Sequence, residues 1–593
     1  MNTTFKIKRK SGTYAELLET YGLANLLNNF MQADNSITIH TVNDSAYEIR
    51  INKPLPDNML EDILYFPLFK YIKTKLETDV SQYSEYYDYP ELKTWKKERQ
   101  ELLNNAYKET DKVKRENEIK RIETLFDTHK PIPCEFDVVA QFVNPNVFSG
   151  FNKMYQNFFA NKDNFSDFIN EIIRSYSDEN HESTTFDRLI KTLTFDKNPT
   201  ATQLLNPNQG KGLKAAKANS VSGGNFNSSW ISETMKISGA LSDMICQLVK
   251  VGTSYDLKVF VPEYKDINYE SKTDLIKKFK KRLKGKNTPV KIDILNILLL
   301  TQLVIDKLGF TGRRRKVKDI VSGLHSVYQK DLGQNKAVIN IGFMQVPDFI
   351  EISNHEEVRT WIEILEEQRS IIGNISELGN TTQGLLLYRD FISGGNIYSF
   401  FEFSFWYAQY LTSQLSNKKY AKAFSIETLN KFYNNMDTQE LNLIDIINNG
   451  GFKAIANAIR ESTIVLQTIA SLKKQSKASD WQIEKLGLYS IRYGVAQALQ
   501  SKSKTEDELV TYIGDFISCY NSETALKAET KGKSFRPNVR ENDLQSFFTL
   551  VHQSQKPKLI GALLASYGFA LLAKENQSTI DVDENVNENI DEQ

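Results

Sequence analysis

The chain has 593 residues, 40% hydrophobic and 11% aromatic, which is enough to build several packed domains without disulfides or structural metals. Lysine plus arginine and aspartate plus glutamate are equal at 74 each, so the net charge favours no class of partner and only the placement of the charges is informative. The three cysteines, Cys134, Cys246 and Cys519, form no CxxC pair, which argues against a zinc ribbon and a disulfide framework and favours a cytoplasmic location.

Hydropathy argues against membrane insertion. The first residues are basic but no apolar run follows them, so we expect no signal peptide. The two most apolar stretches, 292–308 and 559–573, are interrupted by polar residues or too short to span a bilayer, and we expect both to be buried helices. No membrane partner is expected.

The first 375 residues predict a mixed α+β domain with long insertions. Apolar residues at helical spacing alternate here with short runs of period two, and a long, highly charged stretch indicates a projecting helical hairpin. In chain order we expect a helix at 14–31, a β-hairpin at 37–42 and 47–51, the helical hairpin at 92–130, and strands at 136–142, 256–261 and 337–343.

The remainder predicts an all-α helical bundle over 376–574 and a disordered acidic tail over 575–593. Strand patterns nearly vanish and short polar connections separate the helical ones, as in a bundle. The tail is acidic and contains no aromatic residue. Helices are predicted at 385–415, 426–435, 452–472, 481–500, 506–520, 542–552 and 558–573.

Familiar enzyme and cofactor motifs are absent from the sequence. It contains no GxxxxGK[ST], HExxH or GxSxG pattern. Residues 210–215 fit the loose GxGxxA dinucleotide pattern, but the flanking residues predict neither the strand before it nor the helix after it that a pyrophosphate site needs. We therefore expect no cofactor, no metal and no catalytic residue, although a metal-free acid–base site stays open because carboxylate pairs assemble in space.

Residues 206–217, NPNQGKGLKAAK, are the first candidate for nucleic-acid binding. Glycines let the backbone approach a ligand closely, amide side chains can read base edges, and lysines can neutralise phosphates. A surface loop with solubilising lysines is an equally good interpretation. The candidate residues are Asn206, Asn208, Gln209, Lys211, Lys214 and Lys217.

Two basic clusters follow. Residues 258–291 hold eleven lysines and arginines against four acids, and a second cluster follows a Gly-Phe-Thr-Gly turn. Such clustering in a chain of zero net charge is the electrostatic footprint of a phosphate-backbone site, with solvated helix faces as the alternative. The candidate residues are Lys277, Lys278, Lys281 and Arg282 in the first cluster and Arg313, Arg314, Arg315 and Lys316 in the second.

A late basic loop, 527–540, is the last candidate. Phe535 in it could stack on an unpaired base, although basic helix connections often carry no function. By contrast, the aromatic run 398–410 has helical spacing and is interpreted as core. The candidate residues of the loop are Lys531, Lys533, Arg536 and Arg540.

The order of several segments resembles the large subunit of type I CRISPR effector (Cascade) complexes of the I-A/I-B group. These segments are ETYGLANLLNNF before the ITIH–YEIRI hairpin, LLNPNQGKGLKAAKA leading into WISETMKISGALSDM, DLKVFVPEYKDI, and LIGALLASYGFALL near the end of a helical last third. Some relatives carry a CxxC zinc insertion; this chain has none, so no metal role is carried over.

The resemblance implies a non-catalytic subunit that binds crRNA and associates with other Cascade subunits. It implies recognition of the protospacer-adjacent motif in target double-stranded DNA, assistance to R-loop formation, and recruitment of a separate helicase-nuclease in trans. The N-terminal domain would contact the crRNA 5′ region and the motif duplex, and the C-terminal bundle, similar to small subunits, would line the displaced strand. Two alternatives stay open: a nucleic-acid-processing enzyme with a divergent site, and a helical scaffold that binds proteins only.

Overall fold

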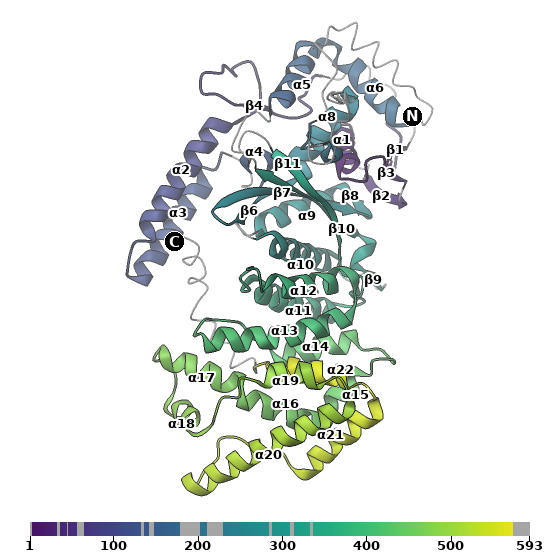
Figure 1. Ribbon diagram of the computed structural model, residues 1–593. Helices are drawn as coiled ribbons and strands as arrows, with labels where there is room; N and C mark the ends of the chain where they lie inside the picture. The colour runs from purple at the N-terminus through teal and green to yellow at the C-terminus, as the bar shows by residue number, and fades with distance from the viewer. Residues whose placement is uncertain are drawn as a thin grey trace, which may run out of the picture. The chain divides into compact units, whose positions relative to one another are not determined.

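The computed structural model divides the chain into two units (Figure 1). Unit 1 comprises Met1–Pro289 and Lys318–Val346, and unit 2 comprises Val290–Val317 and Pro347–Gln593. The predicted boundary at residue 375 differs from this division, because the chain crosses between the units earlier and more than once. The structure describes residues 3–31, 36–43, 45–55, 64–131, 136–141, 148–177, 202–209, 229–283, 288–308, 314–331 and 336–572.

Unit 1 is an α+β unit, as the sequence predicts. Its described residues form two four-stranded sheets, β1-β3-β2-β8 and β11-β10-β7-β6, and a short parallel pair, β4-β5. Its strands are β1 (Thr4–Lys8), β2 (Ile37–Asn43), β3 (Ala46–Ile51), β4 (Tyr71–Lys73), β5 (Tyr86–Asp88), β6 (Ile245–Val251), β7 (Ser254–Tyr264), β8 (Asp266–Asn268), β10 (Val321–Asp331) and β11 (Lys336–Gln345). Its helices are α1 (Ala15–Asn28), α2 (Tyr89–Ala106), α3 (Lys112–Thr128), α4 (Val138–Gln141), α5 (Ser149–Ala160), α6 (Phe165–Ser177), α8 (Trp230–Asp243) and α9 (Tyr269–Arg282).

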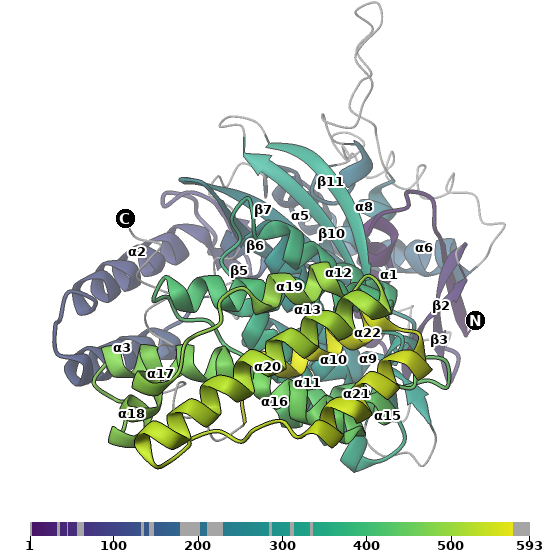
Figure 2. The ribbon, with the colours of Figure 1, turned by 60° about the horizontal axis from the view of Figure 1, so that its bottom comes forward.

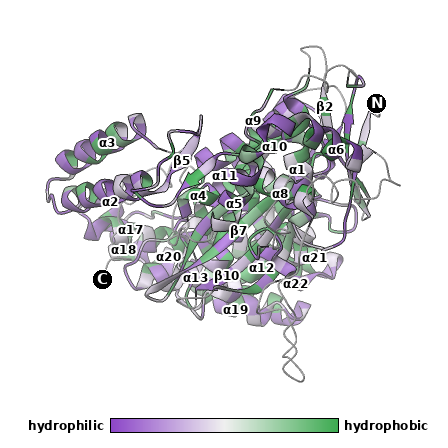
Figure 3. Cartoon of the chain, turned by 90° about the horizontal axis from the view of Figure 1, so that it is seen from above, coloured by the Kyte–Doolittle hydropathy of each residue, from purple (hydrophilic) through white to green (hydrophobic). Residues whose placement is uncertain are grey.

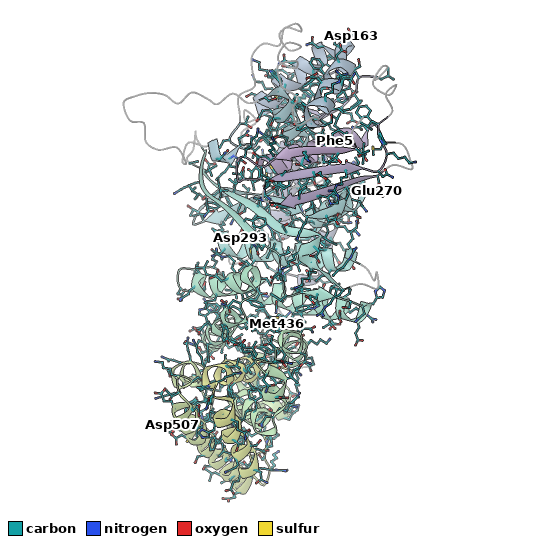
Figure 4. The ribbon with its side chains drawn as sticks, turned by 90° about the vertical axis from the view of Figure 1, so that its right-hand side faces the viewer. Phe5, Asp163, Glu270, Asp293, Met436 and Asp507 are labelled. Atoms are coloured by element: carbon teal, nitrogen blue, oxygen red, sulfur yellow. The ribbon has the colours of Figure 1, made fainter. Side chains whose placement is uncertain are left out.

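The first sheet contains the predicted hairpin. Strands β2 and β3 pair antiparallel with Ile39 opposite Ile49, and β1 adds to the outer side of β3. Phe5, labelled on this sheet in Figure 4, is buried together with Ile39 and Ile49. The alternation of apolar and polar residues thus places one face of the hairpin in the core.

The second sheet has β7 and β10 at its centre. Every residue of β7 from Asp256 to Tyr264 is buried, and β10 pairs with it on one side and with β11 on the other. Strands β6 and β10 escaped the sequence prediction. In β10 the buried residues include the polar His325 and Gln329, which obscure its hydrophobic pattern.

Residues 136–142 were predicted to form a strand, and this prediction was wrong. Residues 138–141 form the short helix α4, and Ala140 N donates to Asp137 O at 2.9 Å in its first turn. An apolar run this short does not distinguish a strand from a buried helical turn. Just before this helix, the carboxylate of Asp137 pairs with Lys280 Nζ at 2.5 Å.

The predicted charged hairpin is formed by α2 and α3, which are largely hydrophilic along their length (Figure 3). Asp88 caps α2 by accepting from Glu91 N at 2.9 Å, and Asp111 caps α3. Trp95 of α2 and Phe126 of α3 hold the two helices together with ring centroids 5.7 Å apart. A narrow apolar seam therefore suffices to pair two otherwise solvated helices.

Unit 2 is mostly helical, which confirms the predicted bundle. Its helices are α10 (Pro289–Leu308), α11 (His355–Gly373), α12 (Thr382–Gly394), α13 (Ile397–Ser416), α14 (Ile426–Met436), α15 (Leu443–Asn448), α16 (Gly450–Ser462), α17 (Ile464–Lys474), α18 (Asp480–Leu488), α19 (Val495–Lys502), α20 (Glu506–Lys531), α21 (Glu541–Ser554) and α22 (Pro557–Gly568). Its strands are β9 (Arg315–Lys316) and β12 (Glu351–Ile352), which pair antiparallel.

Two apolar helices form the centre of this bundle. Every residue of α22 from Leu559 to Gly568 is buried, α22 packs against α13 and α16, and α21 also packs against α16 (Figure 2). The aromatic run of α13 is core, as predicted: Phe400, Phe403 and Tyr407 are all buried. Among the described residues, no helix combines the length and apolarity needed to cross a bilayer. The predicted acidic tail, 575–593, lies outside the described residues.

A largely buried carboxylate in unit 2 makes stability depend on pH. Burial raises the pKa of Glu367 from 4.5 to about 7, and Glu367 Oε2 has no hydrogen-bond partner among the described residues. A carboxyl whose pKa is raised on folding costs nothing below its unfolded pKa, and its penalty grows from about pH 4.5 to pH 7 and is constant above. We compare the free energy of unfolding of Glu367→Gln with that of the unsubstituted protein by chemical unfolding at pH 4.5 and at pH 8. We expect this difference to shift by about 3 kcal/mol in favour of the variant from the lower to the higher pH.

The informative quantity is the change in relative stability between the two pH values. The absolute stability of the variant is less informative, because burying the amide of glutamine has an unfavourable free energy that does not depend on pH. Glu366, the exposed neighbour of Glu367 on α11, supplies the matched control Glu366→Gln. If the stability of the two variants depends on pH in the same way, the raised pKa of Glu367 is contradicted.

Candidate nucleic-acid interface

Asn206 at the start of the glycine–lysine segment is a buried structural residue and not an exposed base reader. Its exposed fraction is 3%. Its Nδ2 donates to Glu233 Oε1 at 3.0 Å, and Lys236 Nζ donates to Asn206 Oδ1 at 2.8 Å. The buried ion pair of Glu233 with Lys236 needs further hydrogen bonds to offset its desolvation, and the amide supplies them. This corrects the role predicted for Asn206.

The rest of the segment is only partly described. Asn208 is exposed, within the 3₁₀ turn η4 (Pro207–Gln209) that also contains the backbone of Gln209. Lys211, Lys214 and Lys217 lie outside the described residues. Their proposed contacts with phosphates and bases therefore stay predictions.

The first basic cluster lies on α9, which has one buried and one solvated side. Asn268 caps the helix by accepting from Ser271 N at 2.7 Å, and Leu275 and Phe279 are buried. The basic residues of the last turn also complement the negative end of the helix dipole. The predicted residues Lys277, Lys278, Lys281 and Arg282 are all exposed.

Two other lysines of α9 have a structural role. Lys272 Nζ lies 2.6 Å from Asp243 Oδ2, and both side chains are at most 1% exposed. Lys280 Nζ lies 2.5 Å from Asp137 Oδ1 and donates to the carbonyl oxygen of Ser242 at 3.0 Å. These pairs attach α9 to the end of α8 and to the start of α4, so the surface lysines between them stand on a fixed support.

The exposed cations of α9 differ in their surroundings. Lys278 Nζ pairs with Asp274 Oδ2 at 3.1 Å. Within the described part of the chain, Lys277 and Lys281 form no ion pair, and both line a cleft of about 840 Å³. These two side chains are available to an anionic ligand.

The second basic cluster is partly neutralised. Arg313 lies outside the described residues, and Arg314 and Lys316 both contact Glu351 of β12, the latter at 2.8 Å. The hydrogen bond from Lys316 and the two positive charges hold the pKa of Glu351 below its ordinary value. Arg315 is exposed on β9. This cluster therefore presents less free charge than its sequence suggests.

Arg536 in the late basic loop was predicted to bind nucleic acid, but the structure buries it. It is 4% exposed, and its guanidinium carbon lies 4.0 Å and 4.1 Å from the ring centroids of Tyr489 and Tyr520. Its Nη2 donates to Glu523 Oε2 at 2.7 Å. A planar cation between two rings, with a carboxylate at its edge, ties the loop to α20.

The other residues of this loop lie at the surface. Lys531, Lys533 and Arg540 are exposed, and α20 extends to Lys531, so the predicted loop is helical at its start. Lys533 Nζ lies 2.8 Å from a carboxylate oxygen of Glu484 and 5.2 Å from the ring centroid of Phe535. Phe535 is half-buried against a small apolar cluster, so only part of its ring can meet a base.

Unit 1 also holds a buried charged cluster that sequence patterns did not reveal. His325 Nε2 lies 2.5 Å from Glu263 Oε2, and Arg9 Nη1 lies 3.2 Å from Glu263 Oε1. Burial acts to raise the pKa of Glu263, but its hydrogen bonds and charge pairing with His325 and Arg9 hold it below its ordinary value. Glu263 and His325 are each about 5% exposed or less, and they lie on the paired strands β7 and β10.

Within the described residues, no group of three or more histidine, cysteine, aspartate or glutamate side chains is arranged to hold a metal ion. Comparison of the sequence with models of known protein families finds no match, and a search of curated proteins finds no relative.

Proposed function

We propose that the chain is a non-catalytic, nucleic-acid-binding large subunit of a crRNA-guided type I CRISPR surveillance complex. In this role it recognises the protospacer-adjacent motif in duplex DNA, assists R-loop formation and recruits a separate helicase-nuclease. Its partners are crRNA, target DNA including the displaced strand, and the other Cascade subunits.

The observation that carries the binding function is the exposed basic side of α9. The exposed cations of this helix are Lys277, Lys278, Lys281 and Arg282. Two further lysines, Lys272 and Lys280, form buried ion pairs. Clustered surface cations on a rigid support are what a phosphate backbone requires, because each neutralised phosphate releases a condensed counterion.

Several of the segments that carry the sequence resemblance pack together in unit 1, whereas the last, LIGALLASYGFALL, lies in α22 of unit 2. The segments in unit 1 include α1, α8 and β7. Helices α1 and α8 pack closely, and Tyr21 of α1 donates to the carbonyl oxygen of Pro262 in β7 at 2.5 Å.

Unit 2 is assigned to the displaced strand in this proposal. Its exposed Lys531, Lys533 and Arg540 supply the positive charge. Arg536 contributes indirectly, by fixing the loop that carries Lys533.

The experiment that tests the function is co-expression of the tagged chain with its genomic neighbours, followed by sequencing of any RNA that co-purifies. Short RNAs of uniform length with repeat-derived ends are the expected result. Recovery of the chain free of RNA and of partner subunits would overturn the proposal.

A second prediction concerns α9 directly. Substituting Lys277, Lys278, Lys281 and Arg282 together by alanine removes four surface cations. We expect duplex DNA affinity to fall about tenfold or more. The negative slope of log K against log salt should become shallower by about 1 for each phosphate that is no longer neutralised. Fluorescence anisotropy titrations at several salt concentrations measure both quantities.

The matched control changes four exposed lysines of the α2–α3 hairpin to alanine, namely Lys93, Lys97, Lys114 and Lys120. It has the same change in net charge, and we expect it to leave the slope nearly unchanged. If the two quadruple variants lose equal affinity, α9 is not the backbone site.

A further inference from the structure

The cleft beside α9 is built from segments far apart in sequence. Its volume is about 840 Å³, within the range of roughly 300–1,000 Å³ typical of small-molecule sites. The lining comes from α9, from the end of α8, from Asn25 of α1, and from Tyr87 and Lys130 near the two ends of the α2–α3 hairpin. All of these segments belong to unit 1.

One wall of the cleft is held rigidly. The buried pairs of Lys272 with Asp243 and of Lys280 with Asp137 lie along this wall. Tyr269 is also fixed, because its hydroxyl donates to Asn25 Oδ1 at 3.1 Å. A preformed wall lowers the conformational cost of binding a ligand.

The charge of the cleft is positive. The pairs of Lys272 and Lys280 are internally neutral, and Lys130 lies 3.9 Å from Asp127. Lys277 and Lys281 lie one turn apart on α9 and face no carboxylate within ion-pairing distance among the described residues. The cleft is therefore suited to a dianionic group such as a phosphate.

Most of the uncharged lining is aromatic or apolar. Tyr87, Phe136 and Tyr269 all line the cleft and are half-buried. Aromatic rings of this kind offer stacking or edge contacts to a planar base, worth about 1–3 kcal/mol per base in nucleic-acid sites.

We propose that this cleft binds a nucleotide, with its phosphate at Lys277 and Lys281 and its base against the aromatic lining formed by Tyr87, Phe136 and Tyr269. The nucleotide is either a free mononucleotide or an unpaired nucleotide of a bound strand. The second source rests on the proposed nucleic-acid-binding function, whereas the first does not.

The test uses the full-length protein and calorimetric titration with adenosine 5′-monophosphate (AMP), adenosine, inorganic phosphate, and a short 5′-phosphorylated single-stranded oligonucleotide. AMP binding at least tenfold tighter than adenosine or phosphate alone identifies a free mononucleotide as ligand. Binding of the oligonucleotide without binding of AMP identifies the nucleotide of a strand. Failure of all four to bind overturns the proposal.

Two charge-reversal variants locate the site. Lys277→Glu with Lys281→Glu changes two lining residues, and Lys93→Glu with Lys114→Glu makes the same charge change at exposed residues of the α2–α3 hairpin that do not line the cleft. We expect the first variant to lose tenfold or more of the affinity for the ligand that binds, and the second less than threefold. Equal losses would overturn the proposal, because they would indicate unspecific attraction.

The nucleotide site and the nucleic-acid-binding function can fail independently of each other. A protein that binds AMP in the cleft but shows no salt-sensitive binding of strands would refute the nucleic-acid-binding function and retain the nucleotide site. If the protein binds strands in a salt-sensitive manner and the Lys277/Lys281 variant binds them equally well, the nucleotide site is refuted and the nucleic-acid-binding function is retained.

Discussion

Gly239→Val is expected to unfold the core of unit 1, at a cost of more than about 4 kcal/mol. Helices α1 and α8 cross at a contact between backbones: a Cβ at Gly239 would overlap the carbonyl oxygen of Leu18, and a Cβ at Gly22 would overlap that of Met235. Because both neighbours are backbone atoms, no side-chain rotation can relieve the overlap and the helices must separate. Hydrogen exchange of the α1 and α8 amides measures the loss directly.

Gly150 provides the control for this substitution. It lies in α5 of the same unit, and an added Cβ would meet only the Thr202 methyl group, at an ordinary 3.7 Å. We expect Gly150→Ala to change stability by no more than about 1 kcal/mol. If Gly239→Val instead leaves α1 and α8 as protected as Gly150→Ala does, the close crossing of these helices is refuted.

Lys272→Met is the second substitution with a large expected effect, about 3–5 kcal/mol of destabilisation. The side chain keeps a similar length but loses its charge, and Asp243, which is 0% exposed, then remains as a buried carboxylate. Its remaining described hydrogen bond comes from Ser242 Oγ at 2.6 Å. Desolvation of an uncompensated charge, and not the loss of one attractive contact, accounts for the size of the effect.

Lys278→Met, six residues further along α9, is the matched control. Its pair with Asp274 is about half exposed on both sides, at 54% and 44%, so we expect a loss below about 1 kcal/mol. Urea unfolding at neutral pH compares the two variants. The double substitution Lys272→Met with Asp243→Leu should recover part of the loss; failure of any recovery would show that Lys272 acts through packing and not through Asp243.

Sequence patterns predicted the fold class and most of the elements that have a clear period. The hairpin at β2 and β3 and the apolar helices α10 and α22 follow directly from spacing, because one face or all faces of each are buried. Prediction failed where burial includes polar groups. Strand β10 places His325 in the core against Glu263, and a partner 62 positions away in the chain leaves no mark on local hydropathy.

The candidate site was predicted less completely for the same reason. Composition identified the basic stretch of α9, but it could not distinguish Lys272, which is buried with Asp243, from the exposed Lys277. Likewise, the sequence around Arg536 is typical of a surface cation, whereas the fold places Tyr489 and Tyr520 against its guanidinium group. Which of several neighbouring cations is free depends on acids and rings contributed by other helices, and this information exists only in three dimensions.

The path of the chain between the units limits how such a protein can be divided or inherited. Because unit 2 takes Val290–Val317 from the middle of the sequence and unit 1 takes Lys318–Val346 after it, the chain passes from one unit to the other at three places. A gene split at residue 346 would leave the second product without α10 and β9, including Val290 N and Lys291 N, which donate to Glu377. Neither unit therefore corresponds to one contiguous stretch of the reading frame.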